Sequence, residues 1–115
     1  MVPRVSIFDF VEERGKKVAA EHGDDVMFFM TDVTDEKNVQ ASIDKTMDAL
    51  GAIHVAINCA GVATLAKVLS KEGPMSMDHF NQVVQINLMG TMNIVRLALK
   101  KWYKTHPMKM AKKGS

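Results

Sequence analysis

Small and polar residues follow an apolar run near the middle of the chain, and this pattern predicts a ligand site. Residues 53–57 read Ile-His-Val-Ala-Ile, and residues 58–61 read Asn-Cys-Ala-Gly. The apolar run is typical of a strand buried on both faces of a parallel sheet. Open α/β sheets bind ligands at the carboxyl ends of their strands, where small side chains let a ligand approach the backbone. Asn58 can both donate and accept hydrogen bonds there.

Two carboxylates and one thiol stand near the ends of the apolar runs. Asp9 ends the run 5–9, and Asp32 follows the run 26–30. Taken singly, each Asp is as typical of a strand-end cap or turn former as of a ligand site. Cys59 is the only cysteine, so the chain forms no internal disulfide and a reducing compartment is expected. Because the sequence places no base near Cys59, we expect it to pack as a small residue rather than to act as a nucleophile.

Asn87 falls within a stretch that is predicted to form a long helix. Ser76 is a suitable N-cap, Asp78 suits the first turn, and the helix is expected to run to about Trp102. A buried Asn needs partners, since an unpaired polar group costs about 1–3 kcal/mol, and the plainest interpretation is a bond to nearby backbone. Gly90 costs about 1 kcal/mol against Ala in a helix and indicates a kink or a close helix contact. The predicted apolar face comprises Phe80, Val83, Val84, Leu88, Val95 and Ala98.

Alternating strands and helices must position these residues. The first helix is expected over 12–22 with a stop at Gly23, and the second begins near an N-cap at Thr34 and closes at Gly51. This alternation predicts an α/β fold with a parallel sheet built from βαβ units. Residues 62–74 are expected to form a loop that could make one wall of a substrate pocket. The apolar stripe of the second helix is Val39, Ile43, Met47 and Leu50.

Composition sets the class of protein. The 115 residues suit one small domain, and 47% hydrophobic with 24% charged residues excludes general disorder. No apolar run reaches the roughly 18 residues of a membrane span, and no secretory signal is visible at the start. The net charge of +2 is weak, although lysines crowd the last 16 residues. A basic tail could touch nucleic acid or acidic lipid, but a solvated helix end is favoured, so we expect no nucleic-acid partner and no membrane.

Four features coincide in order and spacing: Phe8-Asp9, Asp32-Val33, Asn58-Cys59-Ala60-Gly61 and Asn87-Leu88-Met89-Gly90. Together they resemble the short-chain dehydrogenase/reductase family, and most of all its 3-hydroxyacyl-CoA dehydrogenase type 2 branch. The resemblance runs from about residue 5 to residue 99. It implies an oxidoreductase that oxidises a secondary alcohol of the hydroxyacyl-CoA or hydroxysteroid class with NAD as cofactor.

The resemblance also implies roles for single residues. Asp9 would accept hydrogen bonds from the adenosine ribose hydroxyls and repel a 2′-phosphate, and no Arg or Lys directly follows it, which favours NAD over NADP. Asp32 would accept from the adenine amino group. Asn87 resembles the Asn of the family's catalytic tetrad, which orders a water in a proton relay. No metal site is implied. The implied cofactor-binding set is Asp9, Phe10, Asp32, Val33, Asn58, Cys59, Ala60 and Gly61.

Other parts of the family pattern do not occur in this sequence. There is no glycine-rich phosphate loop, and Tyr103, the only tyrosine, is followed four residues later by Pro107 rather than by Lys. The tetrad Ser is also not matched. Hydride transfer to a carbonyl needs a proton donor, so we expect the chain alone not to turn over substrate. Among the tetrad positions, only Asn87 is matched.

For the fold, the resemblance implies a partial Rossmann-like three-layer sandwich. It would have three parallel strands with flanking helices and would lack the first strand and everything after the long helix. Residues 1–104 would form the partial dinucleotide-binding domain, and residues 105–115 a basic tail. The lacking strand belongs between the strands at Val5 and Ile53, so either these two close up and pair or their edges bind other chains.

Two other readings stay open. The chain could be a non-catalytic truncated isoform that docks on full-length subunits through its long helix, since full-length relatives are expected to be homo-oligomers. It could also be another Rossmann-like enzyme, such as a methyltransferase, although the pair of segments 58–61 and 87–90 argues against this. An intracellular, mitochondrial location is expected from the resemblance alone.

Overall fold

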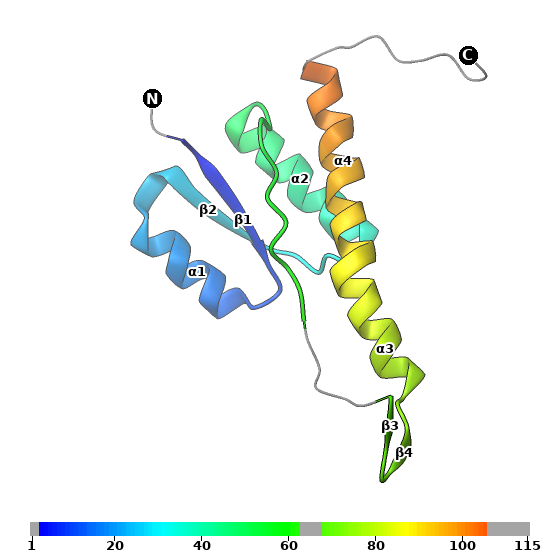
Figure 1. Cartoon of the computed structure of the whole chain (residues 1–115). Coiled ribbons are helices and arrows are strands. Elements are labelled where there is room, and N and C mark those ends of the chain that lie inside the picture. The colour runs from blue at the N-terminus through cyan, green and yellow to red at the C-terminus, as the bar shows by residue number, and fades with distance from the viewer. Residues whose placement is uncertain (1–2, 63–67, 106–115) are drawn as a thin grey trace, which may run out of the picture.

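A computed structural model describes residues 3–62 and 68–105 of the chain. The described part combines helices with one parallel and one antiparallel pair of strands (Figure 1). The predicted α/β class is therefore confirmed. Most of the predicted basic tail, residues 106–115, lies outside the described residues. Within 3–62 and 68–105, no helix combines the length and the apolar character that a bilayer crossing requires.

The first half of the chain forms a βαβ unit with the strand bounds that the sequence predicts. β1 (Val5–Asp9) and β2 (Val26–Met30) pair in parallel, with Asp9 opposite Met30. α1 (Glu12–Glu21) makes the crossover and is followed by a short 3₁₀ turn, η1 (Gly23–Asp25). Because parallel strands point the same way, the residues after both strands lie at one edge of the sheet.

α1 approaches the sheet through a residue that has no side chain. Gly15 is buried, and a Cβ built on it would lie 2.1 Å from Cε2 of Phe28. No real Cβ tolerates that distance, so the Phe28 ring occupies the space that a side chain at position 15 would need. The helix ends as predicted, because Gly23 adopts a φ of 71°, which other residues rarely adopt.

α2 (Glu36–Leu50) begins one residue later than predicted. Its N-cap is Asp35, whose carboxylate accepts the Asn38 N–H at 3.2 Å, and not Thr34. Thr34 instead donates both its N–H and its hydroxyl to Oδ1 of Asp32. The end of the helix is as predicted, since Gly51 adopts a φ of 83°.

The core lies between α2 and the long C-terminal helix. Its buried apolar residues come from only these two elements, and Phe8, Val33 and Ile53 pack against them. Three buried hydroxyl residues, Thr31, Ser42 and Thr46, accompany this core. Thr31 Oγ1 lies 2.6 Å from Ser42 Oγ, so the hydroxyls satisfy one another where α2 meets the sheet. The buried apolar residues are Val39, Ile43, Ile94, Leu97 and Ala98.

The predicted long helix is present, in three successive parts. These are α3 (Met77–Val84), the π-helical turn η2 (Gln85–Met89) and α4 (Gly90–Thr105). Ser76 occupies the N-cap position but makes no side-chain cap bond. A π turn inserts one extra residue, so a face defined by regular α-helical spacing before η2 does not continue after it.

The predicted apolar face of this helix is wrong. Of its six residues only Ala98 is buried, whereas Ile94 and Leu97 were not part of it and face the core. Leu88 and Val95, which were predicted to face inward, are exposed. The stripe that packs against α2 is therefore shifted round the helix relative to the regular pattern.

The third predicted strand is also wrong. Residues 52–62 form no strand, and β1 has β2 as its only partner among the described strands. Figure 1 shows this stretch, in green, running between β1 and α4 as an irregular trace. Val55 is 75% exposed and Ile57 is 81% exposed. The apolar run lacks neighbouring strands to hydrogen-bond with, and apolar character alone does not form a strand.

A short hairpin precedes the long helix. β3 (Leu69–Ser70) and β4 (Gly73–Pro74) pair antiparallel, where the sequence predicted a loop. Gly73 has a φ of 114°, which suits a tight return of the chain. Residues 63–67 of the predicted pocket wall lie outside the described residues.

Candidate functional site

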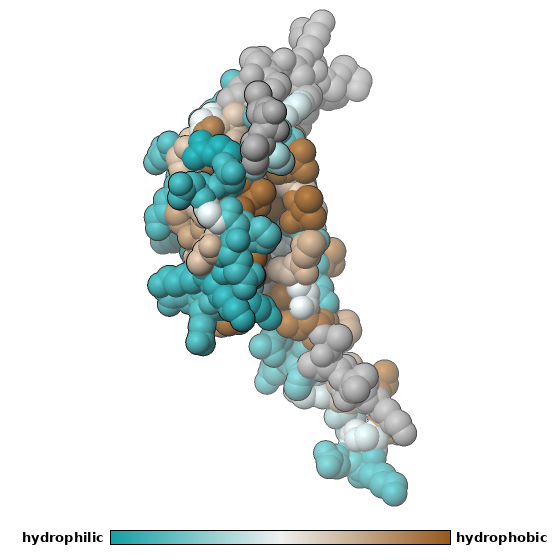
Figure 2. Space-filling view, turned by 90° about the vertical axis from the view of Figure 1, so that its left-hand side faces the viewer, coloured by the Kyte–Doolittle hydropathy of each residue, from teal (hydrophilic) through white to brown (hydrophobic). Residues whose placement is uncertain are grey.

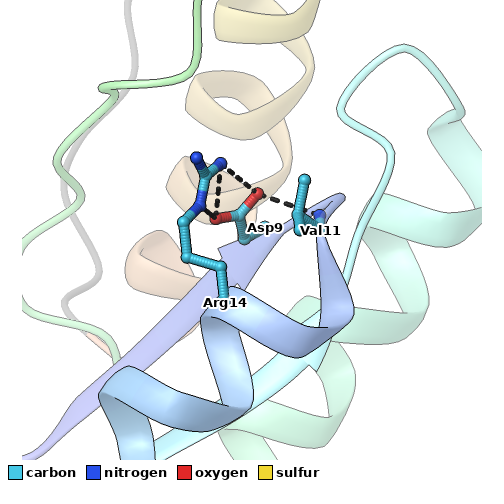
Figure 3. A network of polar contacts seen from close by, with 3 residues as sticks. All are labelled: Asp9, Val11 and Arg14. Atoms are coloured by element: carbon cyan, nitrogen blue, oxygen red, sulfur yellow. Dashed lines mark hydrogen bonds and ion pairs between the residues drawn. The ribbon is translucent and has the colours of Figure 1, made fainter.

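Asp9 stands at the carboxyl end of β1 and is held by its own neighbours (Figure 3). Its Oδ1 accepts the Val11 N–H at 3.1 Å and Nη2 of Arg14 at 3.3 Å. Its Oδ2 accepts Nε of Arg14 at 3.2 Å. The hydrogen bond from Arg14, followed by that from the Val11 N–H, lowers the pKa of Asp9 below its usual value. The carboxylate is therefore charged at neutral pH and already carries three hydrogen bonds.

Arg14 is the site residue that the sequence reasoning missed. The expectation that no cation offsets Asp9 considered only the residues directly after it, and it is wrong, since Arg14 forms an ion pair with Asp9 at 3.2 Å. The signal was present in the pattern. A residue in the first turn of a helix that follows a strand closely can point back to the strand end. The preference for NAD over NADP, which rested on this expectation, stays a prediction.

Phe10 and Asp32 have different surroundings. Phe10 is 69% exposed and lies on the surface beside Asp9. Asp32 follows β2 and accepts from the N–H of Thr34 at 2.9 Å and from its hydroxyl at 2.6 Å. Oδ1 of Asp32 thus forms the turn that leads into α2, which is the turn-former role that the sequence left open. This bonding leaves Oδ2 of Asp32 available for a further role.

The two carboxylates share an edge of the sheet. The N–H of Thr31 donates to the carbonyl of Asp9 at 2.9 Å, so the parallel pairing continues past Met30. Asp32 is the next residue, and the ends of β1 and β2 are adjacent (Figure 1). The sequence predicts that Asp9, Asp32 and Asn58 lie along one edge of a shared sheet. The pairing of β1 with β2 brings the first two together, whereas Asn58 lies in a stretch that belongs to no strand.

Val33 connects this edge to the long helix. Its carbonyl accepts Nδ2 of Asn93 at 2.9 Å, and its side chain packs against the core. A Cβ built on Gly90 would lie 2.6 Å from Cγ2 of Val33. The close helix contact predicted for Gly90 is therefore confirmed, and its partner is the residue that follows Asp32.

Asn87 is the other candidate ligand-site residue. Its Oδ1 accepts the Val62 N–H at 2.7 Å, and its Nδ2 donates to the Val62 carbonyl at 2.8 Å. The backbone bonding is as the plainest interpretation predicts, but Asn87 is exposed and not buried. It lies in the π turn, and such turns are frequent at functional sites. The side chain thus fixes the backbone just after Gly61.

Residues 58–61 are brought to the same helix. A Cβ on Gly61 would lie 3.3 Å from Oδ1 of Asn87, so the two touch closely. No hydrogen bond within 3–62 and 68–105 joins Asp9 or Asp32 to this stretch. Asn58, Ala60 and Cys59 are exposed, so the expectation that Cys59 packs as a small residue is wrong. Its backbone belongs to the irregular stretch, which has no sheet to pack into.

A mainly apolar groove of about 330 Å³ separates the irregular stretch from α4. This volume is at the low end of small-molecule sites. In the space-filling view, apolar surface is visible beside the hydrophilic surface that covers much of this face (Figure 2). No group of three His, Cys, Asp or Glu suited to a metal occurs within 3–62 and 68–105. The groove walls include Ile53, Val55, Asn58, Val95, Leu99 and Trp102.

The chain is similar in sequence to known dehydrogenases. The sequence model of the short chain dehydrogenase family matches residues 3–114. The 3-hydroxyacyl-CoA dehydrogenase type-2 of Drosophila melanogaster is 38% identical over 96 residues, which are 82% of this chain and 38% of that protein. The human protein of the same name is 32% identical over 110 residues, 94% of this chain and 42% of that protein. A 3-alpha-(or 20-beta)-hydroxysteroid dehydrogenase of Mycobacterium bovis is 30% identical over 112 residues, 97% of this chain and 39% of that protein.

Solved structures agree with the sequence comparisons. ElxO with NADPH bound superposes with a TM-score of 0.76 at 27% identity, covering 89% of this chain and 41% of that chain. A short chain dehydrogenase from Mycobacterium smegmatis gives a TM-score of 0.77 at 26% identity, covering 85% of this chain and 40% of that chain. The chain spans about two fifths of the length of these relatives. It belongs to the short-chain dehydrogenase family.

Proposed function

We propose that this chain supplies the adenosine side of a nicotinamide-dinucleotide site. The whole protein would be an oxidoreductase acting on a secondary alcohol or ketone of the hydroxyacyl-CoA or hydroxysteroid class, with NAD as cofactor. The observation that carries the proposal is the charged Asp9 carboxylate at the end of β1, next to the end of β2. Relatives named for both substrate classes support the choice of substrate.

The residues of this edge fit the adenosine half of a dinucleotide. A carboxylate offers about four acceptor positions, and Asp9 accepts from Val11, from Arg14 through both oxygens and also from the backbone of Phe10. Release of Arg14 would open two positions for the ribose hydroxyls. Asp32 would receive the adenine amino group, with Val33 and Phe10 beside the ring. The riboses would lie against Asn58, Cys59, Ala60 and Gly61, which carry small side chains or, in Asn58, an amide.

The pyrophosphate has no comparable support in this sequence, which contains no glycine-rich phosphate loop. We therefore expect the 115-residue chain to bind nucleotides weakly, with a Kd of about 1 mM or weaker. Asn87 is the one matched tetrad position, and its present bonds to the Val62 backbone suit a role in positioning the chain just after Gly61. Without a matched proton donor, we propose that the chain alone does not turn over substrate.

Nucleotide titration of the ¹⁵N-labelled chain tests the proposal. ADP-ribose should shift the amide resonances near Asp9 and Asp32. The Asp9→Asn variant should bind at least about tenfold more weakly, because a hydrogen bond to a charged group is lost. Asp48→Asn is the matched control, since Asp48 is exposed on α2 and away from this edge. Equal affinity of the Asp9→Asn variant and the unaltered chain would contradict the proposal.

A second candidate function is a non-catalytic subunit that docks on full-length relatives. It is favoured by exposed apolar residues on the long helix, which include Leu88, Met92 and Leu99. Such a surface marks an interaction site more often than a free one when it is continuous. Co-purification with a full-length relative would support this role, and a clean monomer in its presence would contradict it. Fractionation would test the mitochondrial location that the resemblance implies.

A further inference from the structure

We propose that Arg14 is a specificity-determining residue that lets the Asp9 site accept an adenosine ribose carrying a 2′-phosphate as well as one with a free 2′-hydroxyl. This inference rests on the proposed function, because it concerns the same ribose. It would make the chain tolerant of both nicotinamide dinucleotides, although an Asp at the end of the first strand by itself favours the form without the phosphate.

The charge at the end of β1 affects whether a phosphate can approach. An unpaired Asp9 would repel a 2′-phosphate, since like charges placed together are strongly unfavourable. Arg14 contacts both oxygens of the carboxylate, with Nε on Oδ2 and Nη2 on Oδ1 (Figure 3). The pair as a whole is neutral. A phosphate that approaches this edge therefore meets a compensated carboxylate rather than a bare one.

Arg14 has N–H donors that Asp9 does not use. A guanidinium has five N–H donors, and only Nε and one hydrogen of Nη2 are directed at Asp9. The others can bind a phosphate, for which the planar guanidinium is well shaped. The Arg14 side chain is 67% exposed, so neither packing nor burial restrains it. It can turn toward a phosphate or stay on the carboxylate.

The ion pair between Arg14 and Asp9 is weak. Exposed ion pairs shift an equilibrium by about fivefold or less, so a ligand displaces Arg14 from Asp9 at small cost. A ribose with free hydroxyls can therefore take the carboxylate, while Arg14 moves into solvent. Of the acidic residues in this turn, Glu12 is paired with Lys16 at 2.8 Å, whereas the charge of Glu13 opposes a bound phosphate that Arg14 would have to hold.

The test compares two probes that differ only at the 2′ position. ADP-ribose and 2′-phospho-ADP-ribose are titrated into the ¹⁵N-labelled full chain, its Arg14→Gln variant and a Lys17→Gln control on the same helix. In the unaltered chain the two Kd values should agree within about tenfold. In the Arg14→Gln variant the 2′-phosphate probe should bind about tenfold more weakly, since charge-assisted bonds are lost. ADP-ribose should bind equally well or up to about fivefold more tightly, because Asp9 is released.

The possible failures are distinguishable. If ADP-ribose binds but the ratio of the two Kd values is the same in the Arg14→Gln variant and the control, the inference is overturned and the proposed function stands. Rejection of the 2′-phosphate by the unaltered chain by more than about 100-fold also overturns it. If neither probe shifts the amide resonances near Asp9 and Asp32 at concentrations well above the expected Kd of about 1 mM, the proposed function fails and the inference with it. Arg14→Lys keeps the charge and should keep part of the 2′-phosphate affinity, which a merely structural role would not require.

Discussion

Exposed large apolar side chains are more numerous in residues 52–105 than in residues 3–51, although α4 contributes Ile94, Leu97 and Ala98 to the core. Val39 and Ile43 of α2 are 0% and 1% exposed, but Val55 and Ile57 of the irregular stretch are 75% and 81% exposed.

This difference shows that apolar side chains favour burial, but that they are buried only where another element offers a surface to pack against. β2 becomes a strand because β1 pairs with it along its whole length. The run 53–57 has comparable apolar character but no partner strand, so its backbone groups are not ordered into a ladder. The second half is attached chiefly through α4, by its packing on α2 and by its bonds at Val33.

The largest expected effect compares the same substitution in the two halves. Ile43→Ala removes buried side-chain volume and should lower the free energy of unfolding by about 2–5 kcal/mol. Ile57→Ala, in a side chain that is already exposed, should change it by less than about 0.5 kcal/mol. Urea unfolding followed by circular dichroism measures both. A loss at Ile57 as large as that at Ile43 would mean that the irregular stretch is docked in solution, and the comparison would break.

The next effect concerns the two glycines at which helices make close contact. Gly15→Ala would place a Cβ 2.1 Å from the Phe28 ring, and Gly90→Ala would place one 2.6 Å from Cγ2 of Val33. We expect each to lower stability by about 1–3 kcal/mol, because overpacking outweighs the gain in helix propensity.

A double substitution sharpens this prediction. Val33→Ala removes the methyl group that Gly90→Ala would meet, so the Gly90→Ala/Val33→Ala double variant should be more stable than the sum of the two single effects implies. Thermal unfolding of the four chains gives the coupling. If Gly90→Ala alone costs nothing, α4 is not pressed on Val33, and the second half is attached less firmly than the first.

A smaller effect is expected at the hydrogen bonds that fix the end of the irregular stretch. Asn87→Ala removes both bonds to the Val62 backbone and should cost about 1 kcal/mol, since the site is exposed to water. Amide exchange at Val62 should accelerate at the same time. Asn81→Ala, on the exposed surface of α3, is the control and should leave that exchange rate unchanged.

Much of the first half was predictable from sequence because its signals are local. The bounds of β1 and β2 and the glycine stops at Gly23 and Gly51 follow from apolar runs and from backbone freedom. Asp9, Asp32 and Asn87 could be named because each stands at a strand end or repeats a family pattern. Their exact bonds could not, since the ion pair with Arg14 depends on how the first turn of α1 points back toward β1.

The second half was less predictable because its structure depends on distant partners. The sequence of residues 53–57 does not indicate whether a neighbouring strand is present. The structure has an irregular stretch there instead of the expected strand. The π turn η2 has no simple sequence signal, and the packing of α4 on α2 buries Ile94 and Leu97 while Leu88 and Val95 stay exposed. Both errors come from using the local pattern of apolar residues to predict contacts that depend on other segments of the chain.

The smallest expected effect compares an ion pair within the first half with one between the halves. The Arg14 hydrogen bond lowers the pKa of Asp9, and the Lys101 hydrogen bond lowers the pKa of Asp44, from the usual 3.8. A carboxyl whose pKa is lower in the folded chain stabilises it fully above about pH 5 and loses that contribution as the pH falls through 3.8 and below. Asp44→Asn and Asp9→Asn should therefore each cost less than about 1 kcal/mol at pH 7 and less than that at a pH below 3.8, measured by urea unfolding at both pH values. Because the Asp44–Lys101 pair, at 2.9 Å, joins α2 to α4, its loss should also speed amide exchange in α4, whereas loss of the Asp9–Arg14 pair should not. Equal effects of the two variants on α4 would show that the halves unfold as one unit.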